Sequence, residues 1–66
     1  MSDELTELLD TAIYKEIASQ ALYIAGQRTT QDQGVRTLMK ELAEEELKHS
    51  HWLKGIKEKE LDHTHY

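Results

Sequence analysis

The chain has no cysteine and no proline, and only three of its 66 residues are glycine. Without cysteine no disulfide can form. The chain is also short enough that one copy buries too little apolar surface to be comfortably stable alone. Because small scaffolds without disulfides usually depend on a metal ion or a partner chain, we expect a metal, oligomerisation or both.

Positive charge and long apolar runs are also scarce. The formal net charge is −5, which argues against nucleic acid and against an anionic membrane surface as partners. No apolar run approaches the roughly 18–20 residues that span a bilayer. The opening residues Met-Ser-Asp-Glu show no signal-peptide pattern. The expectation is a cytoplasmic protein with neither nucleic acid nor a membrane as partner.

What the chain does contain is Leu, Ala, Glu, Lys and Gln, which are good helix formers. The pattern predicts an all-α chain with a first helix over about 3–26 and a second over about 31–60. Residues 61–66 are expected to form a frayed tail. A short polar loop between two long helices makes an antiparallel hairpin, which we treat as a single domain over 1–66.

Local signals set the predicted helix ends. Ser2 can cap the first helix, and Gly26 suits the left-handed position after its last turn. Thr30 and Gln33 fit a capping box for the second helix. Because two helices are only half a bundle, two copies are expected to form a four-helix bundle.

Each predicted helix has an apolar stripe at about 100° per residue. In the second helix His49 lies at the centre of the stripe, with Glu46 near one margin and Glu45 near the other. In the first helix Glu16 lies near the middle of the stripe, and Tyr23 follows two turns later. The apolar members are Leu5, Leu8, Leu9, Ala12, Ile13, Ile17 and Ile24 in the first helix, and Val35, Leu38, Met39, Leu42, Trp52, Leu53 and Ile56 in the second.

Carboxylates in an apolar stripe need a partner, because an unpaired buried charge costs several kcal/mol. No lysine or arginine lies in either stripe, so a cation from solution is the simplest partner for Glu16, Glu46 and His49. Glu46 and His49 are three residues apart and can point at one ion. Glu45 is four residues from His49 and remains an alternative or additional ligand.

These residues resemble a known family. A Glu on one helix and Glu-x-x-His on its neighbour, doubled, is the ligand set of ferritin-like di-iron carboxylate bundles. The chain has Glu16-x6-Tyr23 on the first helix and Glu46-Leu-Lys-His49 on the second. Both patterns are similar to those of rubrerythrins and ferritins, over roughly residues 5–56. With two helices instead of four, the chain most resembles the encapsulated ferritins, whose hairpins pair to form the metal site between chains.

The resemblance implies an inter-subunit di-iron site with two irons per dimer. Glu46 of each chain would bridge the irons, Glu16 would be a carboxylate ligand to one iron, and His49 would be a terminal nitrogen ligand. Tyr23 would take a catalytic part by hydrogen-bonding a ligand carboxylate. The implied activity is oxidation of ferrous iron by oxygen or peroxide, as in a ferroxidase or a rubrerythrin. Carboxylate and imidazole ligands suit iron or manganese.

The resemblance also implies partners. Rubrerythrins carry a second, cysteine-bound iron that this chain cannot hold, so peroxide reduction would need a separate electron donor. Encapsulated ferritins are cargo of a nanocompartment shell, although no addressing peptide is visible after Leu61. Two other interpretations stay open. In the first, the hairpin is a non-catalytic helical interaction module. In the second, it is half of a longer ferritin-like protein.

Overall fold

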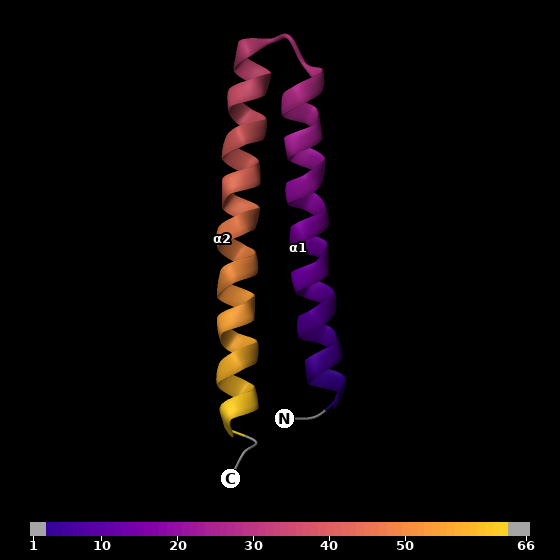
Figure 1. Ribbon diagram of the computed structural model, residues 1–66, viewed down its shortest axis with the longest axis vertical. Coiled ribbons are helices and arrows are strands. Elements are labelled where there is room, and N and C mark those ends of the chain that lie inside the picture. Colours follow the sequence, from indigo (N-terminus) through magenta and orange to yellow (C-terminus); the bar gives the residue numbers. More distant parts are fainter. Residues whose placement is uncertain (1–2, 64–66) are drawn as a thin grey trace.

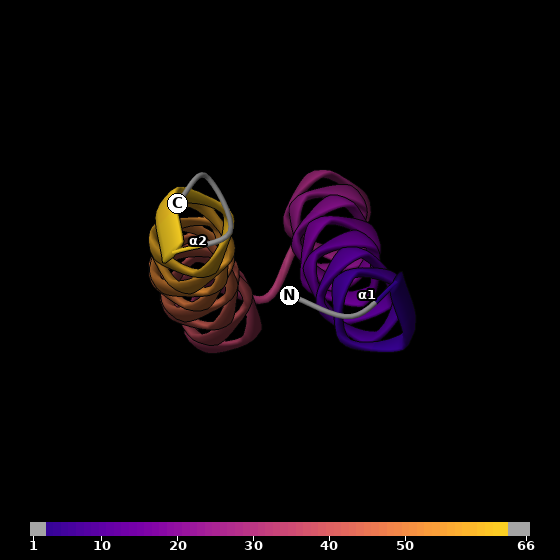
Figure 2. The same cartoon turned by 90° about the horizontal axis from the view of Figure 1, so that it is seen from below.

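A computed structural model describes residues 3–63 of the chain, and the side chains of residues 4–59. It contains two α-helices, α1 over Asp3–Thr29 and α2 over Gln33–His63, and no strand within the described part. The helices lie antiparallel and side by side along their length (Figures 1 and 2). The predicted all-α hairpin is therefore confirmed. Neither described helix has an apolar stretch long enough to cross a membrane.

The end of α1 differs from the prediction. The helix continues past Gly26 to Thr29, and no described residue has a positive φ, so Gly26 is not a left-handed cap. The Gly26 carbonyl instead accepts hydrogen bonds from the Thr30 N–H and the Thr29 hydroxyl, both at 3.2 Å. A Cβ at Gly26 would lie 3.2 Å from Sδ of Met39. The glycine thus serves a close approach of the two helices.

The start of α2 also differs from the prediction. Asp32, and not Thr30, caps the helix, because Asp32 Oδ1 accepts a hydrogen bond from the Val35 N–H at 3.0 Å. The Thr30 hydroxyl accepts from the Asp32 N–H at 3.2 Å and so orders the loop that precedes the cap. The predicted capping box from Thr30 to Gln33 is wrong because the chain has not yet turned into α2 at Thr30.

The end of α2 also differs slightly from the prediction. The helix α2 runs to His63, slightly beyond the predicted end at about 60. Residues 64–66 of the predicted tail lie outside the described residues, as does the predicted cap Ser2.

The two helices meet along a narrow seam. Partly or fully buried residues recur in alternating steps of three and four, which is the spacing of a coiled-coil contact. The positions with this spacing are Thr6, Leu9, Ile13, Glu16, Gln20, Tyr23 and Gln27 in α1, and Met39, Ala43, Glu46, Ser50, Leu53 and Lys57 in α2. Further half-buried residues line the margins of the seam, namely Ala12, Ser19, Ile24, Gly26, Leu42 and Ile56. This seam is narrower than the predicted apolar stripes, so Leu8, Leu38 and Trp52 remain 67%, 50% and 68% exposed.

The cap assignment can be tested by substitution. Asp32→Ala removes the acceptor for the Val35 N–H and should lower the free energy of unfolding by about 1 kcal/mol. Thr30→Ala should cost less, because the Thr30 hydroxyl bonds only within the loop. Thermal unfolding followed by circular dichroism, at one protein concentration, compares the two. A larger loss for Thr30→Ala would contradict the assignment.

Candidate metal centre

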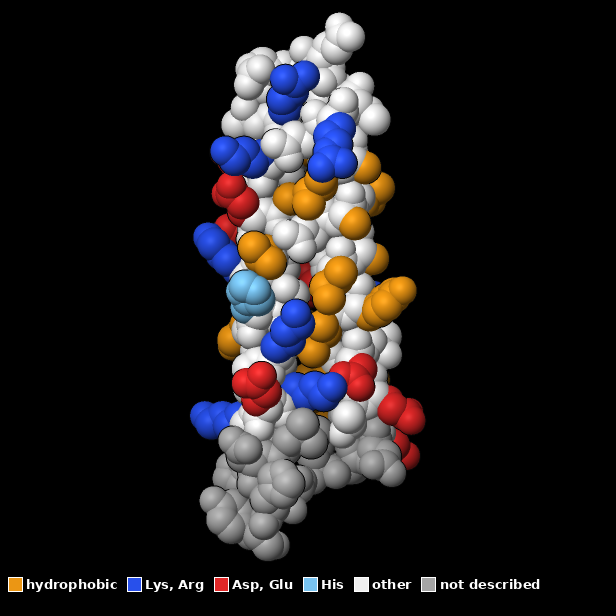
Figure 3. Space-filling model, in the orientation of Figure 1, with side chains coloured by type: hydrophobic (Ala, Val, Ile, Leu, Met, Phe, Trp, Pro, Cys, Tyr) orange, Lys and Arg blue, Asp and Glu red, His pale blue; other side chains and the backbone are white. Residues whose placement is uncertain are grey.

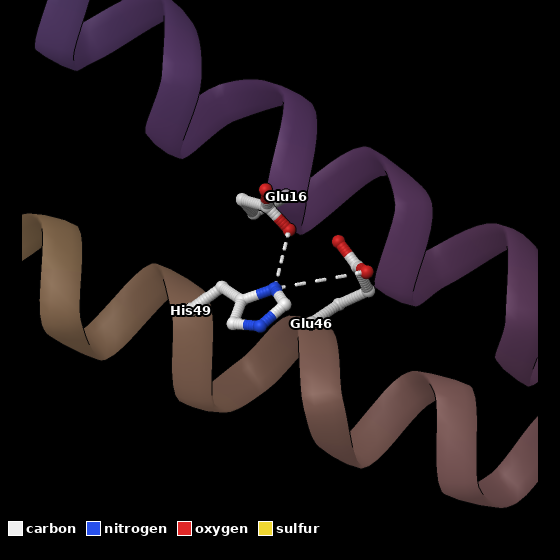
Figure 4. Close-up of side chains that lie close together, drawn as sticks. All are labelled: Glu16, Glu46 and His49. Carbon is white, nitrogen blue, oxygen red and sulfur yellow. Dashed lines mark ion pairs between the residues drawn. The ribbon is translucent and has the colours of Figure 1, made fainter.

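Three potential ligands converge midway along the hairpin. Glu16 comes from α1, and Glu46 and His49 come from successive turns of α2 (Figure 4). The Nδ1 atom of His49 lies 3.5 Å from Oε2 of Glu16 and 3.9 Å from Oε1 of Glu46. One ligand atom of each residue lies within 4.8 Å of the others. Metal–ligand bonds of about 2.0–2.2 Å could be reached from this spacing by small side-chain rotations.

The two helices bring the ligands to one level because their lengths from the loop match. Glu16 precedes the end of α1 at Thr29 by as many positions as Glu46 follows the start of α2 at Gln33. At about 1.5 Å per residue, both are about 20 Å from the loop. Had α1 ended at Gly26, Glu16 would lie nearer the loop than Glu46, and the two carboxylates would not be level. The extension of α1 past Gly26 therefore sets the alignment of the site.

The carboxylate of Glu16 is poorly satisfied. Its side chain is 26% exposed, but Oε2 itself is buried and has no hydrogen-bond partner. The Glu46 side chain is 19% exposed. A buried acceptor without a partner costs about 1–3 kcal/mol. Within the described chain, this oxygen is placed where a cation would relieve that cost.

The nearby lysines do not supply that cation. Lys48, next to His49 in sequence, pairs with Glu45 at 3.4 Å on the exposed surface. Lys57 lies in the seam near the open end of the hairpin and pairs with Asp10 across the helices. Among the described residues no lysine or arginine pairs with Glu16 or Glu46. Within the described side chains, the only neighbour that could carry a positive charge is His49, and only when protonated.

The predicted ligands are brought together, but their places in the contact differ from the prediction. Glu46 lies in the seam, whereas His49 lies at its edge with its side chain 51% exposed. The apolar stripe predicted His49 at the centre and Glu46 at the margin. That stripe spans a wide arc, whereas α1 covers only the side of α2 that carries Ala43, Glu46 and Ser50. His49 therefore opens toward one face of the hairpin.

The other candidates lie apart from this group. The Glu45 side chain is 56% exposed and engaged with Lys48, so a single hairpin does not add it to the ligands. Tyr23 is half-buried two turns along α1 from Glu16 and lines a hollow with Gly26 and Met39. Its predicted hydrogen bond to a ligand carboxylate stays a prediction. His51 is exposed, and His65 lies outside the described residues.

Two small residues that the apolar stripes did not single out hold the site. Ser50 and Ala43 are 2% and 7% exposed, and they flank Glu46 along the seam. The Ser50 hydroxyl donates to the Leu47 carbonyl at 2.8 Å, so it needs no partner from α1. Small side chains at these positions let the helices approach closely enough for Glu16 to reach His49. Their spacing of one heptad was a visible signal of this seam.

The ligand chemistry fits a first-row transition metal. Two carboxylates and one imidazole suit iron or manganese, and the absence of thiolate argues against a structural zinc site. The buried, unpartnered Oε2 of Glu16 is the observation that this fit depends on. Comparisons with protein-family models, curated proteins and solved structures found no significant match to this chain. The case for a metal site therefore depends on the residues and their geometry.

A stability measurement can test whether Glu16 is costly without metal. Glu16→Met removes the unpartnered carboxylate while keeping a side chain of similar length. In metal-free buffer with chelator it should raise the free energy of unfolding by about 1–2 kcal/mol. The matched control is Glu45→Met, which should stay within about 0.5 kcal/mol of the unsubstituted protein. Destabilisation by Glu16→Met would show that Glu16 is satisfied without a cation.

Proposed function

We propose that two copies of this hairpin pair into a ferritin-like four-helix bundle with a shared di-iron carboxylate site. The observation that carries the proposal is the buried Oε2 of Glu16, which lacks a hydrogen-bond partner and faces His49 beside Glu46. The Glu16 and Glu46–His49 pattern, doubled in a dimer, matches the ligand set of di-iron carboxylate bundles.

One hairpin offers an incomplete site. It provides three ligand residues, while iron with oxygen-rich ligands commonly takes about six. The side of the hairpin onto which His49 opens also carries exposed apolar residues. Leu38 lies three turns before His49, Leu5 lies three turns before Glu16, and Trp52 lies one turn after His49. A second copy on this side would cover these residues and add its own ligands.

The position of the group suits a two-fold contact. Glu16 is at the midpoint of α1, and His49 lies near the middle of α2. A contact centred on the site would therefore overlap both hairpins along almost their whole length. Off-centre ligands would have left part of each apolar face uncovered. The contact would also be isologous, with the same residues on both sides.

Charge also favours two metal ions per dimer. Two copies bring four carboxylates from Glu16 and Glu46, and two imidazoles from His49. Without cations these carboxylates would repel one another across the interface. Two divalent ions would balance them, so metal binding should strengthen the dimer.

The activity that we propose is oxidation of ferrous iron, with oxygen or peroxide as the electron acceptor. In this proposal Glu16, Glu46 and His49 of each copy would hold the irons, with Glu46 as the ligand shared by both, and Tyr23 would orient a ligand carboxylate. Manganese is the second candidate metal, because the same ligands accept it. A peroxidase function would need a separate electron donor, and a nanocompartment shell is a further candidate partner.

The second candidate function is a non-catalytic helical interaction module. The exposed apolar side chains favour it, since Leu8, Leu38 and Trp52 would suit a partner helix equally well. In that case assembly would be indifferent to metal, and Glu16 would be protonated or paired with a basic residue of the partner. Metal dependence of assembly separates the two functions.

Native mass spectrometry after anaerobic loading with ferrous iron tests the shared site. We expect a dimer, or a multiple of it, with two irons per pair of chains. Glu46→Ala should lose the iron, whereas Glu44→Ala, on the exposed side of α2, should keep it. A metal-free monomer, or an oligomer that forms equally without iron, would favour the interaction module.

Stopped-flow absorbance of ferrous iron mixed with oxygen tests the activity. Glu16→Ala and Glu46→Ala should each abolish the iron oxidation that exceeds the rate without protein, while circular dichroism shows that the helices persist. Glu45→Ala is the matched control and should retain most of the rate, because Glu45 pairs with Lys48. If both ligand variants still oxidise iron as fast as the unsubstituted chain, the proposed site is wrong.

A further inference from the structure

A basic hollow lies beside the loop, at the end of the hairpin away from both termini. It has a volume of about 490 Å³ and is lined by Ile24, Gln27, Arg28 and Arg36. Basic side chains gather near the loop end of the face drawn in Figure 3. Arg28 is in the last turn of α1, and Arg36 is in the first turn of α2. The loop thus brings the two arginines from different helices to one hollow.

Neither arginine is neutralised by the described part of the chain. Arg36 donates one hydrogen bond, from Nη2 to the Thr30 carbonyl at 2.9 Å, and it forms no ion pair. Arg28 forms neither a hydrogen bond nor an ion pair with any described residue. The nearby carboxylate of Asp32 accepts the Val35 N–H as a cap and is not paired with either guanidinium.

Both arginines are exposed to solvent, so their unpaired guanidinium groups are open to a ligand. The sequence has 13 Asp and Glu against 8 Lys and Arg, yet two arginines share a hollow without a carboxylate partner. Arg28 is favourable near the negative end of the α1 dipole. Arg36 is not, because it lies at the positive end of α2, where no residue of the first turn is acidic. The Asp32 carboxylate that caps α2 offsets part of this positive end, so the case for an anion depends on the two unpaired guanidinium groups.

We propose that Arg28 and Arg36 bind a phosphate group, either inorganic phosphate or a small phosphate monoester. A phosphate monoester carries about −1.5 to −2 charges at pH 7, which is close to the charge of two guanidinium groups, and inorganic phosphate is likewise a multivalent anion. The planar fork of arginine also binds phosphate oxygens in pairs. Gln27 adds an amide donor, and the hollow is large enough for a phosphate group.

The proposed phosphate site is independent of the metal centre. Arg28 lies more than three turns along α1 from Glu16, or about 18 Å at the helical rise. The failure of either proposal would therefore leave the other standing. A test without added iron keeps the two apart, because phosphate would otherwise also bind the metal.

Isothermal titration of inorganic phosphate into the full chain tests the proposal, at constant ionic strength set with chloride. We expect one saturable site per chain. Arg28→Gln should weaken it at least about tenfold, because a charge-assisted hydrogen bond is lost. Arg28 has no hydrogen bond or ion pair whose loss would disturb the fold, whereas Arg36→Gln also removes the bond to Thr30. Circular dichroism on both variants checks helicity.

The matched control is Lys54→Gln, which removes one charge from α2 far beyond Arg36 along the helix. The helical rise puts it about 27 Å from Arg36, well beyond the Debye length of about 8 Å, so binding should change less than about twofold. Ribose 5-phosphate serves as the second probe. Saturable binding of it alone would identify a phosphate ester as the ligand, and binding of both would identify the shared phosphate group. No saturable binding of either probe, or equal loss in Lys54→Gln, would overturn the proposal.

Discussion

The carboxylates of Glu16 and Glu46 lie in the seam between α1 and α2, where a coiled-coil contact normally places apolar side chains. An unpaired buried carboxylate costs several kcal/mol, and this chain has little apolar burial to offset it. Among the described residues only Ile13 and Ala43 are buried hydrophobics. The placement of these two carboxylates in the seam is therefore the central constraint on the hairpin, and the proposed cation and the proposed second copy would each relieve part of its cost.

The rest of the hairpin can be understood from that constraint. The long first helix and the short loop bring Glu16 level with Glu46. Ser50 and Ala43 keep the helices close at this level, while Lys48 and Lys57 are engaged by Glu45 and Asp10. Each feature leaves the seam carboxylates near one another and without a basic partner. Such an arrangement is unfavourable in an isolated hairpin but suits a divalent cation, which agrees with the proposed metal centre.

The two faces of the hairpin differ in character. One carries His49 together with exposed apolar residues such as Leu38 and Trp52, which suits burial against another hairpin. The other has basic side chains toward both of its ends, with carboxylates beside them at the lower end and apolar side chains between the two ends (Figure 3). The two proposals therefore use different faces, the second copy on the face of His49 and the phosphate near the loop on the other.

The sequence by itself determined that the chain is a pair of amphipathic helices and that Glu16, Glu46 and His49 share the inward side, because helical periodicity requires no tertiary information. It did not determine the helix ends, because the predicted signals at Gly26 and Thr30 do not end α1 or cap α2, and the cap Asp32 is decided by where the chain turns. The sequence also did not show which of these residues lie within the seam and which lie at its edge. Only the packing of α1 on α2 decided that Glu46 is enclosed and His49 open, because a helix covers a narrower arc of its neighbour than the whole apolar stripe.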